Sequence, residues 1–167
     1  RTVIGFFDTK ARRLMPWPEA TREKAANLTI NLPNYAAPLR VPAGGAIGQI
    51  SREVSIAEGF FRSGGTGVNS WECDQFGHMN TMFYVRRQTE AGPHFWQLLG
   101  LDQPGLIASG HGFAVSELRM NYINELYEGD MVETLSVLRE VSDRGVRVEH
   151  RLYNFGTGAL SAVSDTS

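Results

Sequence analysis

Hydrophobic and polar residues alternate with a period of two over much of the C-terminal half of the chain. The alternation is clear in the segments 114–122 and 146–152, where charged or amide side chains separate apolar ones. This pattern predicts half-buried β-strands. Two further strands are expected over 131–141 and from 159 to the last residue, with hairpin turns between successive strands.

A helical pattern precedes these strands. An extended lead-in is expected over 66–71, followed by a tight turn at Gly77. Apolar residues then recur at helical spacing as far as Leu99, and Gly100 follows as a C-terminal signal. Pro93 interrupts the pattern and is a candidate kink. One helix of about 20 residues against a largely antiparallel sheet is an α+β architecture.

The N-terminal third of the chain shows no single sustained period. Residues 2–7 are β-branched and aromatic and predict a strand, and residues 19–26 predict about two turns of helix. Pro16-Trp17-Pro18 separates these two elements. Residues 27–59 are rich in proline and glycine in their first part and are interpreted as a linker, although 49–59 fits either a strand or a short helix. The predicted division is 1–26, 27–59 and 60–167.

Composition restricts the class of protein. A chain of 167 residues with 42% hydrophobic and 20% charged residues can build a core as a soluble globular protein. Its net charge of −2 gives no indication of nucleic-acid binding. No apolar run is long enough to span a membrane, and a single cysteine excludes an intrachain disulfide. A cytoplasmic setting is the default expectation; because the chain begins with Arg1, a removed targeting signal stays open.

Asp74 is the first candidate for chemistry. It stands just before the glycine turn and the predicted helix, where backbone N–H groups are unpaired and the helix dipole is positive. Such a turn can bind an anion or polarise a carbonyl oxygen. A carboxylate in this position can act as a base or nucleophile, or simply cap the helix. Spacing alone leaves these alternatives open.

Two motifs resemble a known family. Trp71-Glu72-Cys73-Asp74-x-x-Gly77-His78-Met79-Asn80, with Tyr84 and Glu90 on the helix, resembles the hot-dog fold acyl-CoA thioesterases of the 4-hydroxybenzoyl-CoA thioesterase type. Tyr122-x-x-Glu125-Leu126-x-x-Gly129-Asp130 resembles the segment that leads into their central strands. The resemblance covers roughly residues 60–167. It implies a hot-dog fold, in which an antiparallel sheet wraps around one long helix.

The resemblance also implies roles for individual residues. Asp74 matches the catalytic aspartate, as general base or as nucleophile, and the turn at Gly77, His78 and Met79 would polarise the thioester carbonyl at the helix N-terminus. His78 is a candidate proton shuttle, or a ring that orders the turn. Asn80 is expected to orient the loop or Asp74.

Glu90 is the rival base, because related enzymes place a helix carboxylate in the active site; the alternative is an exposed charge beside Arg86 or Arg87. The two arginines are expected on a solvated helix face, with binding of coenzyme A phosphates as their functional alternative.

The N-terminus resembles the same family in an unexpected place. Residues 3–18 are similar to the strand and Pro-rich tail with which members usually end. The family's C-terminal strand is thus displaced to the N-terminus, by circular permutation or because the chain is a fragment of a tandem repeat. Either explanation predicts that residues 2–7 pair in the sheet beside residues 159–166.

The predicted function is hydrolysis of an acyl-CoA thioester to a free acid and coenzyme A. The resemblance implies that no metal or redox cofactor is needed and that coenzyme A is present only as part of the substrate. It also implies a homodimer or homotetramer. Neither a nucleic-acid nor a membrane partner is expected. Two alternatives stay open: a hot-dog hydratase or dehydratase acting on an enoyl thioester, with His78 catalytic, and a thioester-binding repeat without catalysis.

Overall fold

The computed structural model describes residues 6–8, 10–11, 13–29, 31, 33 and 47–167. The chain divides into two compact units, Arg1–Gly44 and Gly45–Ser167.

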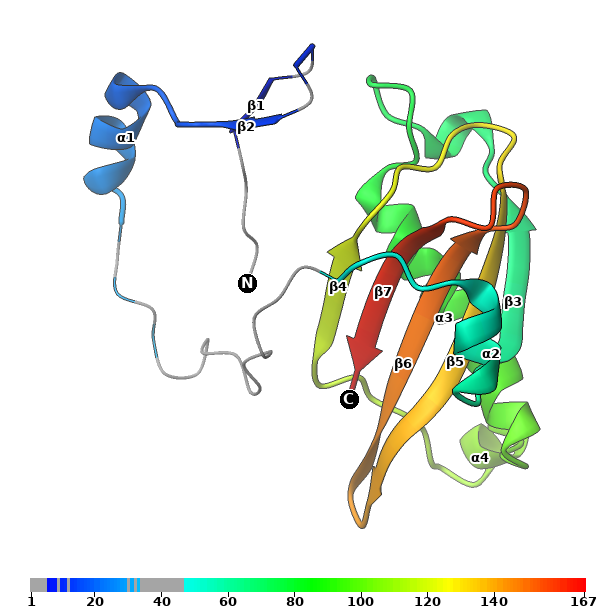
Figure 1. Cartoon of the computed structure of the whole chain (residues 1–167). Coiled ribbons are helices and arrows are strands. Elements are labelled where there is room, and N and C mark those ends of the chain that lie inside the picture. Colours follow the sequence, from blue (N-terminus) through cyan, green and yellow to red (C-terminus); the bar gives the residue numbers. More distant parts are fainter. Residues whose placement is uncertain (1–5, 9, 12, 30, 32, 34–46) are drawn as a thin grey trace. The chain divides into compact units, whose positions relative to one another are not determined.

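The larger unit is built on a five-stranded antiparallel sheet with the order β3-β5-β6-β7-β4 (Figure 1). Its strands are β3 (Phe61–Gly67), β4 (Leu118–Tyr122), β5 (Met131–Ser142), β6 (Gly145–Asn154) and β7 (Leu160–Thr166). The predicted strand content and the antiparallel pairing are confirmed. The prediction that consecutive strands are all joined by hairpins is wrong for β4, which pairs with β7 at one edge of the sheet.

One long helix, α3 (Thr81–Leu98), lies along one face of this sheet (Figure 1). It contains Pro93, as the predicted helix did. The core between helix and sheet is a cluster of buried apolar side chains, formed by Val68, Met79, Tyr84, Leu126, Val132, Leu152 and Ala162. The predicted layer of one helix on an antiparallel sheet is confirmed. A second helix, α4 (Gln103–Ala108), was not predicted, although Asp102 caps it by accepting the Gly105 N–H at 3.1 Å.

Strand order determines the path of the segment between β4 and β5. Because β4 lies at one edge and β5 next to the other, residues 123–130 must pass the ends of β7 and β6, a distance of about 14 Å at the usual strand spacing. This crossover segment (residues 123–130) passes the end of the sheet at which α3 begins (Figure 1). Leu126 at its centre is fully buried and fixes the crossover segment to the core.

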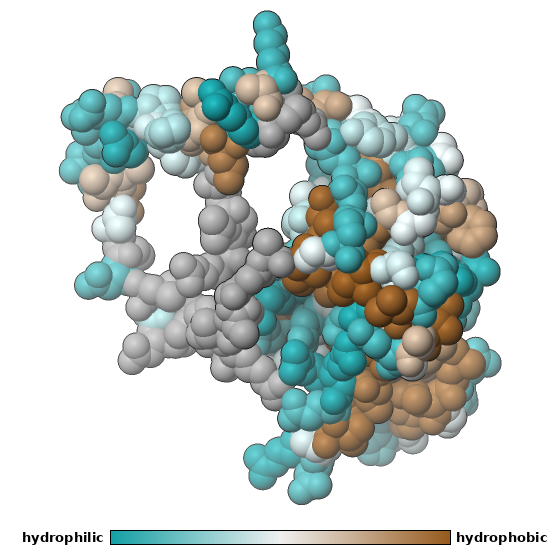
Figure 2. All heavy atoms as spheres, in the orientation of Figure 1, coloured by the Kyte–Doolittle hydropathy of each residue, from teal (hydrophilic) through white to brown (hydrophobic). Residues whose placement is uncertain are grey.

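The opposite face of the sheet is covered by residues that were predicted to form a linker. Helix α2 (Arg52–Ala57) lies there, and Ile47 and Ile50 pack against a second core cluster, which consists of Phe60, Leu135, Tyr153, Leu160 and Val163. Residues 47–59, which were predicted to belong to the linker, thus lie in the compact unit Gly45–Ser167. Of the two alternatives for 49–59, the short helix is correct. Viewed from this side, hydrophilic and hydrophobic residues intermingle over the unit (Figure 2).

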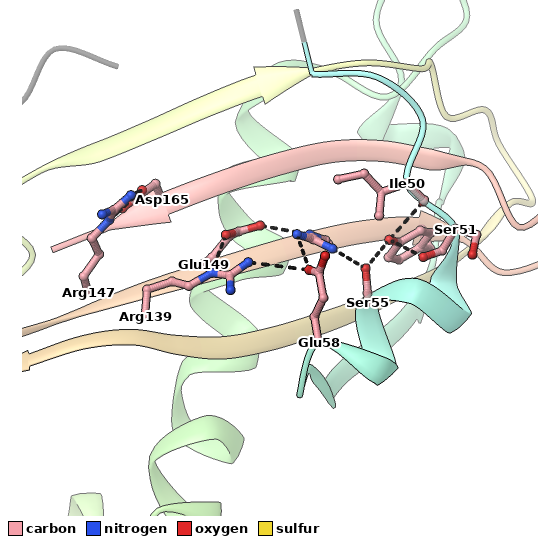
Figure 3. Close-up of polar contacts among 10 residues, drawn as sticks. Ile50, Ser51, Ser55, Glu58, Arg139, Arg147, Glu149 and Asp165 are labelled. Carbon is pink, nitrogen blue, oxygen red and sulfur yellow. Dashed lines mark hydrogen bonds and ion pairs between the residues drawn. The ribbon is translucent and has the colours of Figure 1, made fainter. Parts of the chain in front are cut away.

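Arg151 on β6 joins α2 to the sheet, and three of its partners, Ser55, Glu58 and Glu149, are labelled in Figure 3. Its buried guanidinium donates to Ser55 Oγ at 2.6 Å and pairs with Glu58 at 2.9 Å and Glu149 at 2.9 Å. It also lies 4.1 Å from the centre of the Phe60 ring, a cation–π distance. These hydrogen bonds and ion pairs offset the cost of burying the positive charge of Arg151 on the face of the sheet.

His150 lies on the α3 face of β6 and is buried between the helix and the sheet. Its Nδ1 and the Ser136 hydroxyl are 2.6 Å apart, and the Phe95 ring lies beside it. Burial lowers the pKa of His150 from 6.5 to about 4.

This burial predicts a loss of stability in mild acid. Below pH 6.5 the unfolded chain binds a proton at His150 that the folded protein excludes, so the free energy of unfolding falls as pH drops from 6.5 towards 4. The full loss is about 3 kcal/mol. We expect His150→Gln to remove that part of the pH dependence in urea unfolding curves measured between pH 5 and 8. Equal slopes for the variant and the wild type would contradict the prediction.

In the smaller unit, β1 (Phe6–Asp8) and β2 (Arg13–Met15) form an antiparallel pair, and α1 (Glu19–Ala26) follows. Helix α1 matches its predicted bounds. The predicted pairing of residues 2–7 with 159–166 is wrong for the described part of that segment. Phe6 and Phe7 pair with β2, and β7 already has β6 and β4 as its two neighbours. Residues 2–5 lie outside the described residues, and the sheet gives the displaced-strand hypothesis no support.

Candidate active site

The extended lead-in predicted over 66–71 is correct for Thr66 and Gly67, which end strand β3, and wrong for Ser70 and Trp71. Strand β3 ends at Gly67, and η2 (Ser70–Glu72) forms one turn of 3₁₀ helix. Asn69 and Glu72 close this turn as a capping box, in which the Asn69 N–H donates to Glu72 Oε2 at 2.8 Å. The turn draws Glu72 into the interior.

Glu72 and Arg87 form a buried ion pair behind the site. Arg87 Nη2 lies 2.6 Å from Glu72 Oε2, and both side chains are at most 3% exposed. The same nitrogen donates to the Gly67 carbonyl at 2.9 Å. Burial alone would raise the pKa of Glu72, but hydrogen bonds from Arg87 and Asn69 hold it below its usual value. The pair fixes α3 to the segment that carries the candidate carboxylate.

Asp74 organises the turn that follows. Its Oδ1 accepts the Phe76 N–H at 2.8 Å, its backbone carbonyl accepts the Gly77 N–H at 3.0 Å, and its own N–H donates to the His78 carbonyl at 3.0 Å. Gly77 has a φ of 83°, which confirms the predicted need for glycine at the turn. Asp74 does not cap α3. The cap is Asn80, whose Oδ1 accepts the Met82 N–H at 3.1 Å.

The backbone of this turn differs from the prediction that the N–H groups of Gly77, His78 and Met79 all face the thioester carbonyl oxygen. The helix begins at Thr81, not at the glycine turn, and the N–H of Met79 donates to the Leu126 carbonyl at 2.7 Å. Gly77 and Met79 therefore have no N–H left for a substrate. In the part of the chain that the structure describes, the N–H groups of His78 and Thr81 donate to no protein acceptor. Between Gly77 and Thr81, these two N–H groups are the ones that remain open as donors.

The His78 ring lies between two carboxylates. Its Nδ1 is 3.6 Å from Asp74 Oδ1, and its Nε2 is 3.5 Å from Glu125 Oε1. The three side chains are 20% (Asp74), 23% (His78) and 32% (Glu125) exposed, so the group is half-buried and open to solvent. Glu125 belongs to the crossover segment, which connects β4 to β5 and passes the start of α3. The sequence motif contained Glu125 but gave no indication of this contact.

The crossover segment is held to the site by further contacts. The Tyr84 hydroxyl on α3 donates to the Asn124 carbonyl at 3.4 Å, and burial raises the pKa of Tyr84 to about 12. The Tyr127 hydroxyl donates to Glu125 Oε2 at 2.7 Å, and Asp130 Oδ2 accepts the Tyr127 N–H at 2.8 Å. Tyr127, absent from the predicted site, is thereby part of its framework.

Glu90 lies away from this group. It is ten residues beyond the helix cap, about 15 Å along the axis. Its side chain is 43% exposed and pairs with Arg86 at 2.7 Å. Glu90 thus lies in an exposed ion pair on the helix. This agrees with the second of its two predicted roles, an exposed charge beside Arg86 or Arg87. The predicted solvated face is correct for Arg86 and wrong for Arg87, which is buried.

The described residues contain no group of three or more His, Cys, Asp or Glu side chains that could hold a metal ion. Nor does any of their helices have the length and apolar character needed to cross a bilayer. The site therefore offers carboxylates, an imidazole and backbone donors as its reactive groups.

Comparison with known proteins identifies the family. Residues 68–167 match the family model of the Thioesterase-like superfamily. The chain belongs to this superfamily. The match begins at the end of β3 and includes the turn at Asp74, α3 and the crossover segment. It thus agrees with the hot-dog architecture of the larger unit and with the family resemblance of the two motifs, at the level of thioesterase-like proteins.

Individual relatives support the same assignment. A betainyl-CoA thioesterase of Pseudomonas aeruginosa is 30% identical over 92 residues, which are 55% of this chain and 58% of the relative. An acyl-acyl carrier protein thioesterase of Arabidopsis thaliana is 26% identical over 52% of this chain and 45% of its own length. The matches thus span about half the length of these curated relatives.

Solved structures have the same fold. A gentisyl-coenzyme A thioesterase is 24% identical, with a TM-score of 0.56 over 61% of this chain and 83% of the other. A Staphylococcus aureus protein solved in complex with CoA is 18% identical, with a TM-score of 0.59 over 64% of this chain and 66% of the other. These likenesses confirm the hot-dog thioesterase fold of the larger unit.

Proposed function

We propose that this protein hydrolyses an acyl-CoA thioester to a carboxylic acid and coenzyme A. The observation that carries the proposal is Asp74, a partly exposed carboxylate fixed by the Phe76 N–H beside the start of α3. Membership of the Thioesterase-like superfamily supports it, as do the CoA thioesterases among the relatives. A structural relative with bound CoA supports the same class of substrate.

Asp74 acts on the thioester carbonyl in one of two ways. As a general base it removes a proton from water, and the resulting hydroxide adds to the carbonyl carbon. As a nucleophile it adds directly, and water then hydrolyses the acyl-aspartyl anhydride. In both routes the C–S bond breaks and the thiolate of coenzyme A leaves. The Phe76 N–H holds one carboxylate oxygen and leaves the other available.

Negative charge that develops on the carbonyl oxygen needs hydrogen-bond donors. Between Gly77 and Thr81, the N–H groups of His78 and Thr81 remain open, and Thr81 is the first residue of α3. The helix dipole favours an anion at that end. We therefore assign these two groups, in place of Gly77 and Met79, to the carbonyl oxygen. Asn80 supports the arrangement by capping the helix.

We also propose that the protein is a homo-oligomer in the cytoplasm and that it needs no metal or redox cofactor. A closer relation to the 4-hydroxybenzoyl-CoA thioesterase type also stays a prediction.

A panel of acyl-CoA substrates tests the proposal against its alternatives. We expect purified protein to release free thiol from at least one saturated, aromatic or enoyl-CoA ester, detected with a thiol reagent. Loss of enoyl absorbance without thiol release would instead support a hydratase. Tight binding of an acyl-CoA without turnover of any ester on the panel would support a non-catalytic binding protein.

A further inference from the structure

One of the two carboxylates beside His78 has no part in the mechanism above. Glu125 Oε1 is 3.5 Å from His78 Nε2, while the other Glu125 oxygen accepts the Tyr127 hydroxyl at 2.7 Å. Glu125 is thus held by a neighbour from its own segment. A carboxylate that is fixed in this way can hold a partner ring in one orientation.

The His78 ring is also confined by aromatic neighbours. The Phe76 ring lies 5.9 Å away at an interplanar angle of 23°, close to parallel. The Tyr127 ring lies 6.5 Å away at 75°, edge to face. These contacts restrict rotation of the imidazole, so that one ring nitrogen faces Asp74 and the other faces Glu125.

We propose that Glu125 is a positioning residue for His78 and that Tyr127 keeps Glu125 in place. The inference rests on the hydrolase function proposed above. Glu125 accepts a hydrogen bond from the Nε2–H of His78, and this selects the tautomer in which Nδ1 is unprotonated and faces Asp74. A carboxylate selects the tautomer of a catalytic imidazole in the same way in hydrolase triads.

The selected tautomer gives His78 a defined task. When Asp74 has taken a proton from water, its O–H bond breaks and an Nδ1–H bond forms, which restores the carboxylate. The imidazolium then gives this proton to the departing thiolate, and the carboxylic acid product releases its own proton to solvent. The 3.6 Å between Asp74 Oδ1 and Nδ1 exceeds a hydrogen bond, and such distances shorten in substrate complexes.

Kinetics of three variants test the role of Glu125. We expect Glu125→Gln to lower kcat at least tenfold with little change in KM, a part of the roughly 10²–10⁴-fold that acid–base groups contribute. Tyr127→Phe should lower kcat less, because it loosens Glu125 without removing it. Glu128→Gln is the matched control: it is the same change in the same segment, and Glu128 is exposed. Its kcat should equal that of the wild type.

Nitrogen-15 NMR of the histidine rings tests positioning independently of activity. In the neutral form of the ring, we expect wild-type His78 to carry its proton on Nε2. Glu125→Gln should give a mixture of tautomers at His78, with unchanged thermal stability. The ring signals that are missing from the spectrum of His78→Gln are those of His78, which assigns them.

The two measurements separate this inference from the proposed function. If the wild type hydrolyses no ester on the panel, the hydrolase function fails, while the tautomer still shows whether Glu125 positions the ring. If the wild type is active but Glu125→Gln keeps either its kcat or its tautomer, the positioning role is overturned.

Discussion

Asp74→Asn is expected to lower kcat for thioester hydrolysis by at least about 100-fold, with KM nearly unchanged. The amide can neither accept a proton from water nor attack the carbonyl, and general acid–base groups typically contribute 10²–10⁴-fold. The fold should survive, because the asparagine oxygen can still accept the Phe76 N–H that Asp74 now accepts. Steady-state thiol release from the best substrate of the panel measures the effect.

Two comparisons make this result specific. Glu90→Gln tests the rival base, and a greater loss of kcat in that variant than in Asp74→Asn would transfer the role to Glu90. Rapid quenching followed by mass spectrometry distinguishes the two routes. An acyl adduct on Asp74 identifies it as the nucleophile, whereas hydrolysis without an adduct favours a general base.

Glu72→Gln is expected to lower the free energy of unfolding by about 3–5 kcal/mol. The change removes the buried anion at 2.6 Å from the Arg87 guanidinium, which is 3% exposed at its side chain, and leaves it only the 43% exposed Glu90 carboxylate at 3.7 Å. Breaking one side of a buried pair has this typical cost. The loss should also reduce activity, because the pair fixes α3 to the segment that carries Asp74. Urea unfolding followed by circular dichroism measures it.

The exposed pair on the same helix provides the matched control. Glu90→Gln removes the partner of Arg86, which is 58% exposed, together with a longer 3.7 Å contact to Arg87. It should change the free energy of unfolding by less than about 1 kcal/mol. A double variant, Glu72→Gln with Arg87→Met, should be more stable than the sum of the single effects, since it leaves no buried charge. Similar effects of Glu72→Gln and Glu90→Gln would show that burial does not govern this pair.

The sequence predicted those features of the fold that depend on local periodicity. Alternation located β4 and β6, and helical spacing located α3, because a half-buried element leaves its period in the residues that it buries. The hairpin turns located the neighbouring strands β5 and β7. Strand order was not predicted. The partner of β4 is β7, and nothing in the residues 118–122 distinguishes that neighbour from β5.

The candidate site was predicted only where it is contiguous in the chain. The turn from Asp74 to Asn80 was identified from its motif, but the hydrogen-bond partners of its N–H groups depend on Leu126, which comes from another segment. The contact between His78 and Glu125 has the same origin. Arg87 was expected in solvent because a helix charge usually is, and only the inward turn at Ser70–Glu72 provides its buried partner.

The crossover segment has a consequence for folding. Leu126 and Glu125 reach the turn at His78 only after β4 has docked at one edge of the sheet and β5 near the other. Contacts between residues so far apart in the chain carry a high loop-closure cost and form slowly. We therefore expect a refolding chain to protect the amides of the local β5–β6 hairpin first and to regain thioester hydrolysis in its last kinetic phase.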